Sequence, residues 1–395
     1  MNESGRQPRM IYLSTFVPKK CGLATYTYHL REAVRQSKGG GPQDPVIAVC
    51  NREELKDYRE PWIWPLIKDD PDHYVYMADV VNRSAADAVS LQHEFGIFGG
   101  EAGSFVLEFM KRVKKPIITT FHTVFEHPPK PYASIQKRVA DWSDHLLVMN
   151  RRAVFFLQRS FGIPAGKISF VPHGAPVPGQ TDRHKARAAL GWENRKVLLT
   201  FGLLSRGKGI DFALRVVAET VQAVPDLLYV IAGATHPEVR RTEGEAYRQE
   251  LVSWIRAFKL ERHVQMIDRY IPEDELIAMI TAADLYVSPY PGMQQITSGT
   301  LAYAAGLGRP ILSTPYCYAR DLLKGHEDML LPYGDVAAWS RKIAQLFSDP
   351  GKLATLEAAM MRIGSAMHWP QVGARHLRLF AQVAEGRKTA VPEYT

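Results

Sequence analysis

Short apolar segments alternate with longer helical segments along the whole chain. Six apolar segments rich in β-branched residues lie in the first half, at 10–15, 46–50, 88–94, 116–122, 145–150 and 168–174. Five more lie in the second half, at 196–202, 227–233, 264–268, 285–290 and 310–314. Near-continuous apolar strands separated by helices are typical of parallel sheets covered on both faces. The pattern therefore predicts an α/β fold with two doubly wound parallel-sheet domains.

A proline-rich joint separates the two sets of strands. Residues 175–180 contain two prolines and one glycine, as linkers do. We therefore expect an N-terminal domain over 1–178 and a C-terminal domain over 179–366, and the length of 395 residues is ample for two. Ligands of such sheets bind beyond the carboxyl ends of the strands, so we expect the active site in a cleft between the domains.

Membrane and redox signals are weak in this sequence. No apolar run reaches the ~18 residues of a membrane span, and the first ten residues lack a signal-peptide core, so we expect a cytoplasmic protein. Its three cysteines, Cys21, Cys50 and Cys317, are far apart and odd in number. Reduced thiols are the expected state.

The positive charge is concentrated in one window. The formal net charge is +8, and residues 111–160 hold ten basic and three acidic residues, a net +7. Such a surface fits an anionic lipid surface or nucleic acid, and it is equally the pattern of an ordinary solvated face. The window has no RNP-like or helix-turn-helix pattern, which disfavours a nucleic-acid partner.

The loop after the first strand of the second half favours a phosphate ligand. Three glycines, at 202, 207 and 209, permit close backbone approach, and Arg206 and Lys208 offer positive charge for a diphosphate. The loop matches neither the Walker pattern nor GxGxxG, which disfavours a nicotinamide cofactor.

Two further loops predict anion contacts at helix starts. The segment Thr297–Thr300 opens a helix, so its free N–H groups and three hydroxyls form an anion seat, with a merely capped helix as the alternative. Gly22 stands between the first strand and a helix, where it permits backbone approach to an anion or simply makes a tight turn.

Ionisable residues follow two strands of the first half. His93, Glu94 and His122 lie at strand ends, and Gly96 begins a glycine-rich loop beside them. Such loops suit contacts with sugar hydroxyls or acid–base work, although a single histidine is more often structural. Their spacing does not match a metal site, so no metal is predicted.

Taken in order, these motifs resemble the retaining glycosyltransferases of family 4, which have the GT-B fold of two Rossmann-like domains. The resemblance covers nearly the whole chain, and a bacterial branch of the family is the nearest in its motifs. The residues that carry it are Gly22, 91–100, 120–122, 171–174, 201–209, 234–237, 282–290, 295–303 and 305–310.

The resemblance implies a role for each part of the chain. The C-terminal domain would bind a nucleoside diphosphate sugar, with UDP or GDP left open, and the N-terminal domain a hydroxyl acceptor that is a sugar or a lipid-linked glycan. Lys208 would neutralise the diphosphate, His122 would lie near the transferred sugar, and residues 367–395 would form a tail that crosses back to the N-terminal domain. No cofactor or metal is implied. The expected donor contacts are Gly22, Gly202, Ser205, Gln295, Thr297, Ser298, Gly299 and Thr300.

Two departures from the family pattern change this expectation. The arginine of the phosphate loop is Leu203 here, so Arg206 is expected to supply the second charge. The two family glutamates fall on Gln295 and Tyr303, and no carboxylate occurs from 290 to 319. Ribose hydroxyls therefore cannot be held by a carboxylate at Tyr303, and sugar contacts at Gln295 must be neutral.

The sequence thus predicts a retaining, metal-independent hexosyltransferase of glycan or polysaccharide biosynthesis, with Lys208, Arg206 and His122 as its catalytic residues. The acceptor half would use His93, Glu94 and Gly96 for sugar contacts. The alternative is a catalytically weakened nucleotide-sugar-binding or scaffold protein of the same fold. The basic window falls in the acceptor half. We therefore expect this half to contact anionic lipid at the inner face of a membrane rather than nucleic acid.

Overall fold

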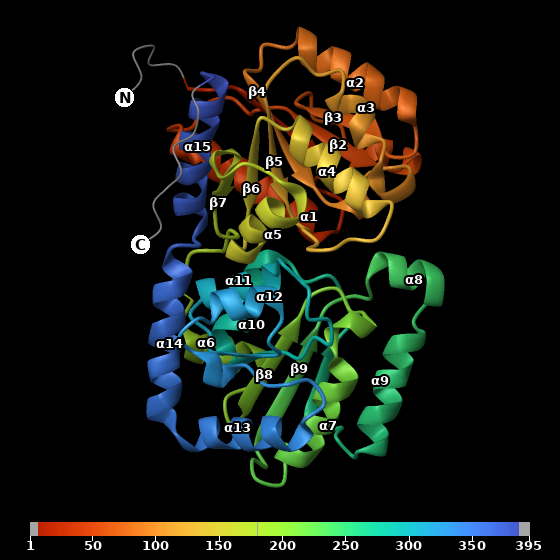
Figure 1. The fold of residues 1–395 in the computed structure, drawn as a ribbon. Helices are drawn as coiled ribbons and strands as arrows, with labels where there is room; N and C mark the ends of the chain where they lie inside the picture. The colour runs from red at the N-terminus through yellow and green to blue at the C-terminus, as the bar shows by residue number, and fades with distance from the viewer. Residues whose placement is uncertain (1–6, 180, 387–395) are drawn as a thin grey trace. The chain divides into compact units, whose positions relative to one another are not determined.

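The computed structural model describes residues 7–179 and 181–386, and Figure 1 shows its ribbon. The chain divides into two compact units, and each is described by itself. The first unit comprises Met1–Gly174 together with Trp369–Thr395, and the second comprises Ala175–His368. This division lies four residues before the expected boundary at 178/179 and two residues after the expected one at 366/367.

Each unit contains one parallel sheet, which confirms the predicted fold class. In the first unit the order is β3-β2-β1-β4-β5-β6-β7, and in the second it is β10-β9-β8-β11-β12. The strands of the first sheet are β1 (Met10–Ser14), β2 (Val46–Cys50), β3 (Ile63–Ile67), β4 (Ala88–His93), β5 (Ile117–Phe121), β6 (His145–Val148) and β7 (Ile168–Phe170). Those of the second are β8 (Lys196–Phe201), β9 (Leu227–Ala232), β10 (Val264–Ile267), β11 (Leu285–Ser288) and β12 (Ile311–Ser313).

Strand β3 is the one strand that the apolar pattern does not predict. It contains Pro65, and its burial is mixed along its length. Proline cannot donate a hydrogen bond to a neighbouring strand, so it occurs at sheet edges. Here β3 pairs with β2 alone, at the edge of the first sheet, where a missing donor on the open side is tolerated.

Helices connect successive strands in both units, except that a short 3-10 helix at Arg52–Asp57 lies between β2 and β3. Those of the first unit are α1 (Gly22–Ser37), α2 (Pro71–Arg83), α3 (Val106–Met110), α4 (Tyr132–Trp142), α5 (Arg151–Phe161) and α15 (Trp369–Ala384). Those of the second unit are α6 (Arg183–Leu190), α7 (Ile210–Thr220), α8 (Pro237–Glu243), α9 (Ala246–Ala257), α10 (Glu273–Ala282), α11 (Gly299–Gly306), α12 (Cys317–Leu322), α13 (Val336–Ser348) and α14 (Pro350–Ser365). None of the helices in the described ranges is long and apolar enough to cross a membrane.

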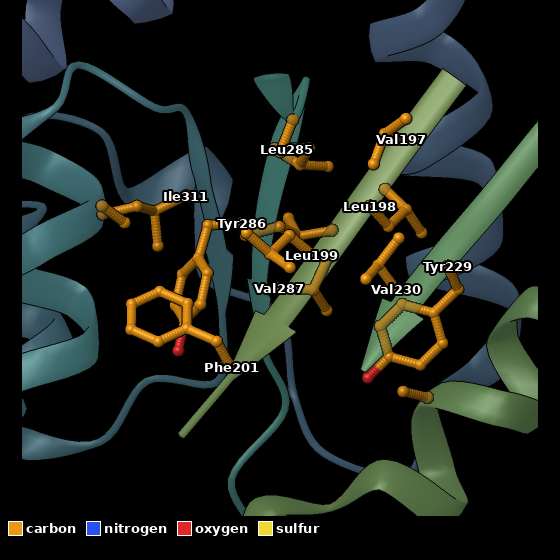
Figure 2. Packing of buried hydrophobic residues seen from close by; sticks show 14 of the residues in the cluster. Val197, Leu198, Leu199, Phe201, Tyr229, Val230, Leu285, Tyr286, Val287 and Ile311 are labelled. Carbon is orange, nitrogen blue, oxygen red and sulfur yellow. The ribbon is translucent and has the colours of Figure 1, made fainter. Parts of the chain in front are cut away.

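The core of the second unit lies against β8 and its neighbours. Figure 2 shows Val197 and Leu199 of β8 beside Val230 of β9 and Val287 of β11. All four side chains are buried, because helices cover both faces of the parallel sheet. This packing fixes the ends of β8 and β11, which carry the candidate site.

Helix α15 belongs to the first unit although it follows the second unit along the chain. It packs along α1, where Trp369 contacts Tyr26 at 5.4 Å between ring centroids and stacks on His29 at 5.4 Å. In the second turn of the helix, a Cβ on Gly373 would lie 2.5 Å from backbone atoms of Ala33. The two helices therefore approach at backbone distance, and a glycine is what permits it.

Four buried histidines predict that acid destabilises the first unit. Burial lowers the pKa of His93 to about 3, and of His145, His173 and His376 to about 4 each. A histidine in the unfolded chain has a pKa near 6.5. Below that pH the unfolded state therefore binds protons that the folded state, with its lower histidine pKa values, does not bind. Stability should fall as the pH drops from 6.5 to about 4, at ~1.4 kcal/mol per pH unit for each group.

Urea unfolding at pH 7 and pH 5, followed by hydrogen exchange of peptides from each unit, measures this effect. The first unit should lose more stability than the second, and His93→Leu should make its pH dependence shallower. Equal losses in the two units would contradict the prediction.

Candidate functional site

The loop after β8 is held close to the end of β11. Gly209 has a left-handed backbone, with φ of 64°, and a Cβ there would clash with the carbonyl oxygen of Pro289. Any other residue would therefore push the loop away from β11. Helix α7 begins at the next residue, so the turn fixes Lys208 just before a helix start.

Lys208 is anchored by a tyrosine rather than by a carboxylate. Its Nζ donates to the hydroxyl of Tyr290 at 2.6 Å and lies 4.6 Å from the centroid of that ring. Tyr290 is buried and stacks on Tyr316 at 5.2 Å. Burial alone would raise the pKa of Tyr290, but the charge of Lys208 and its hydrogen bond hold that pKa below the ordinary value. The ammonium group is thus held in a fixed position against the Tyr290 ring and hydroxyl.

The start of α11 lies beside Lys208. Ser298 caps this helix by accepting from the N–H of Leu301 at 3.4 Å, and its hydroxyl is 3.2 Å from that of Thr300. The Thr300 hydroxyl is also 3.3 Å from that of Tyr290. The predicted helix start at 297–300 is therefore confirmed.

Gly202 completes the group. A Cβ on this glycine would lie 3.3 Å from Cγ2 of Thr300 and 3.8 Å from Nζ of Lys208. We call Gly202, Lys208, Tyr290, Ser298 and Thr300 the Lys208 cluster. A helix N-terminus, hydroxyls and a fixed ammonium at one sheet edge are suited to bind an anion such as a phosphate.

Arg206 is directed to other partners. Its Nη1 donates to Glu250 of α9 at 2.8 Å, its Nε is 3.5 Å from Glu243 of α8, and its guanidinium lies 4.8 Å from the ring centroid of Tyr247. The two carboxylates already compensate its charge. Ser205, just before it, makes no side-chain cap hydrogen bond. Arg206, which was expected to supply the second positive charge for the phosphate, is thus paired with α8 and α9.

The remaining predicted donor contacts lie around the start of α11. Gln295 is exposed, and its Nε2 donates to the carbonyl oxygen of Thr297 at 3.0 Å. Gly299 is the first residue of α11 and is half-buried. These residues border the Lys208 cluster along the chain, with a neutral amide at position 295.

A carboxylate does reach Tyr303, although the surrounding sequence contains none. The Tyr303 hydroxyl donates to Oε1 of Glu273 at 2.9 Å, and Glu273 is the first residue of α10. No carboxylate stands at position 303 itself, but α10 brings one across space to the hydroxyl of Tyr303. The acidic first turn of α10 was the sequence signal for it.

His236 is a second residue without a role in the sequence prediction. Its N–H donates to the carbonyl oxygen of Leu204 at 2.9 Å, and its Nδ1 accepts from the N–H of Glu238, which caps α8. Burial and the charge of Lys208 lower the pKa of His236. The side chain therefore lies close enough to Lys208 to be affected by it and remains neutral.

In the first unit, His122 lies at the carboxyl end of β5. Its Nε2 is 3.0 Å from Oε1 of Gln92, and its ring meets that of Tyr26 edge-on at 4.8 Å. Burial, with His173 and His93 nearby, holds the pKa of His122 well below its ordinary value. The imidazole is therefore neutral at pH 7.

The side chain of His93 lies in the core and is not accessible to a ligand. It is fully buried, packed against Phe95, Phe98 and Phe121, and neither ring nitrogen has a hydrogen-bond partner among the described residues. A side chain enclosed by three phenylalanines cannot contact a sugar, so the predicted sugar contact at His93 is corrected to a core position.

Glu94, Gly96 and Gly22 lie at the same edge of the first sheet. Glu94 accepts from the hydroxyl of Thr123 at 2.6 Å and from the N–H of Phe95 at 3.0 Å, and burial raises its pKa despite these bonds. The Gly96 carbonyl accepts from Lys68. A Cβ on Gly22 would meet only open space, so neither crowding nor a positive φ requires this glycine.

Comparisons with known proteins agree with this architecture. Residues 182–360 match the family model described as glycosyl transferases group 1. D-inositol 3-phosphate glycosyltransferase of Rhodococcus jostii is 26% identical over 275 residues, which are 64% of this chain and 58% of that protein. The chain thus spans less than two thirds of that relative.

Two solved structures are similar over almost the whole chain. Sucrose-phosphate synthase from Thermosynechococcus elongatus has a TM-score of 0.76 at 16% identity, covering 96% of this chain and 100% of that one. Anabaena HepE in complex with UDP and glucose has a TM-score of 0.74 at 15% identity, covering 95% and 100%. Residues 182–360 thus match the group 1 glycosyl transferases, and the solved structures show that the two parallel-sheet units have the GT-B fold.

Proposed function

We propose that the protein transfers a hexose from a nucleoside diphosphate sugar to a hydroxyl acceptor, with retention at the anomeric carbon. The observation that carries the proposal is the Lys208 cluster, which gathers an ammonium group, three hydroxyls and a helix N-terminus in the unit that matches the family model. The match of residues 182–360 to the glycosyl transferase model supports sugar transfer as the chemistry. The complex of Anabaena HepE with UDP and glucose favours a uridine nucleotide.

The charge that develops during transfer explains the need for the cluster. As the sugar leaves, its negative charge grows on the diphosphate, and fixed donors around that charge stabilise the transition state most. Lys208 would contact the phosphate directly, while the N–H groups at the start of α11 add the positive end of a helix. We assign no protein nucleophile, because the departing phosphate can take the proton of the acceptor hydroxyl.

Glu273 supports a ribose contact in the same unit. Its carboxylate reaches Tyr303, one helical turn after Thr300, so a diol bound beside the diphosphate would find an acceptor there. The first unit would bind the acceptor, with His122 nearest the transferred sugar. An anionic lipid or lipid-linked acceptor for its basic surface stays a prediction.

A donor screen tests the proposal. The full chain is incubated with UDP-glucose, UDP-N-acetylglucosamine and GDP-mannose together with sugar and lipid-linked acceptors, and released nucleotide is measured. Acceptor-dependent release with product of retained anomeric configuration supports the proposal. Tight donor binding without release would instead favour the catalytically weakened binding protein. That alternative rests on Gln295, a neutral residue where the family has a glutamate.

Arg206→Ala should affect turnover far less than loss of a direct phosphate contact. Glu243 and Glu250 already hold the guanidinium, so we expect less than a tenfold decrease in kcat/KM, below the ~10²-fold typical of a lost transition-state donor. Steady-state kinetics with the best donor measures it. A decrease of a hundredfold would show that Arg206 leaves its carboxylates to serve the diphosphate.

A further inference from the structure

A buried chain of hydrogen bonds ends at His122. Ser90 and Gln92 lie two residues apart on β4, so their side chains point to the same face of the sheet, and both are fully buried. The Gln92 Nε2 donates to Oγ of Ser90 at 3.1 Å, and its Oε1 is 3.0 Å from Nε2 of His122. The register of β4 with β5 pairs Gln92 with Thr120, two residues before His122.

The direction of the amide determines which nitrogen of His122 carries the proton. An amide Oε1 can only accept, so the Nε2 of His122 that faces it must be the donor. A neutral imidazole has one N–H, and its other nitrogen then has a free lone pair. Within 7–179 and 181–386 no hydrogen bond reaches Nδ1 of His122, and the side chain is half-buried rather than enclosed.

The surroundings keep the imidazole neutral. The groups around it are the ring of Tyr26, which burial keeps protonated, and the imidazoles of His93 and His173, which burial keeps neutral. Burial and the two histidines lower the pKa of His122 itself. A neutral His122 with one set tautomer is therefore the state that meets a ligand at pH 7.

We propose that Gln92 is a positioning residue that fixes the Nε2–H tautomer of His122, so that Nδ1 is presented as a hydrogen-bond acceptor for a substrate hydroxyl. The nature of that hydroxyl, on the transferred sugar or the acceptor, rests on the proposed function. The tautomer itself does not, because the ligand-free protein already contains the hydrogen-bond chain. The reverse orientation of the amide would give the Nδ1–H tautomer and a donor instead of an acceptor.

Nitrogen NMR of the full, ligand-free chain tests the proposal. In protein labelled with ¹⁵N-histidine, two-bond and three-bond couplings to the ring protons distinguish the two tautomers, and His122→Gln identifies the His122 signals. We expect one neutral Nε2–H species at pH 7. Ser90→Ala releases the far end of the Gln92 amide and Gln92→Leu removes the acceptor, so each should give averaged signals of both tautomers.

Kinetics provides a second readout once a donor is found. Each variant should lower kcat/KM by about three- to tenfold, as expected for one poorly oriented neutral hydrogen bond, with most of the change in KM. Ser169→Ala is the matched control, because Ser169 bonds Nε2 of His145 at 2.9 Å on the same sheet without contacting His122. It should leave the His122 signals and kcat/KM unchanged.

The outcomes separate this inference from the proposed function. An Nδ1–H species in the wild type, or unchanged His122 signals in Ser90→Ala, would overturn the role of Gln92. If Gln92→Leu fails to fold, Ser90→Ala decides alone, because losing one hydroxyl is a small change in a buried strand. A fixed Nε2–H tautomer without nucleotide release from any donor would leave the inference standing and remove sugar transfer.

Discussion

Lys208→Ala should lower turnover with the best nucleotide sugar by about 10²- to 10³-fold, the usual cost of losing a transition-state charge contact. The ammonium group is held by Tyr290 beside Thr300 and Gly202, and no other cation belongs to the Lys208 cluster. Arg206 cannot replace it without leaving Glu243 and Glu250. Most of the loss should appear in kcat, because the contact strengthens as charge develops on the leaving diphosphate.

The matched control for this experiment is Lys196→Ala. Lys196 begins β8, the strand whose other end leads into the Lys208 loop, and its Nζ is 3.8 Å from Asp226. Removing a lysine from the far end of the same strand should leave kcat/KM within about twofold, since exposed ion pairs contribute little. A decrease below threefold in Lys208→Ala would contradict the phosphate assignment.

Gly373→Leu should destabilise the first unit by about 3 kcal/mol, the upper end of the cost of overpacking a core. A Cβ at this position would already lie 2.5 Å from the carbonyl carbon and oxygen of Ala33. Because backbone atoms cannot rotate away, α15 must move off α1 and expose Val372 and Phe380, which are fully buried. Urea unfolding with hydrogen exchange of the α1 and α15 peptides measures the loss.

Gly166→Leu makes the same change where an added Cβ meets open space. Its midpoint should stay close to that of the wild type, so the comparison isolates the helix contact. Equal unfolding midpoints for both variants would show that α15 does not depend on close approach to α1.

The strands were the most predictable part of the fold. Eleven of the twelve strands in the described residues follow apolar runs, because a strand buried on both faces must be apolar throughout. The exception, β3, is apolar in sequence but contains Pro65, a residue that is rare inside strands. Low burial at a sheet edge is not the reason, because the edge strand β10 is less buried than β3 and still follows a predicted segment.

The candidate site was predictable only where its residues are close in sequence. The segments that carry Lys208 and Ser298 stand in glycine- and hydroxyl-rich loops, which are local signals. Glu273 contacts Tyr303 from another helix. Arg206 binds carboxylates about 40 residues away in sequence, and its bond to Glu250 spans 44 residues. Such partners depend on how the helices pack in the folded protein, and the spacing of residues along the sequence does not predict that packing.

The return of the chain to its first unit has a consequence for synthesis. Residues 1–174 emerge from the ribosome before the second unit, but the helix that packs on Tyr26, His29 and Ala33 of α1 begins only at Trp369. The apolar face of α1 therefore stays exposed to solvent while the whole second unit is translated, at a rate of ~5–20 residues per second. For roughly ten seconds or more, this face is therefore open to chaperones and to aggregation.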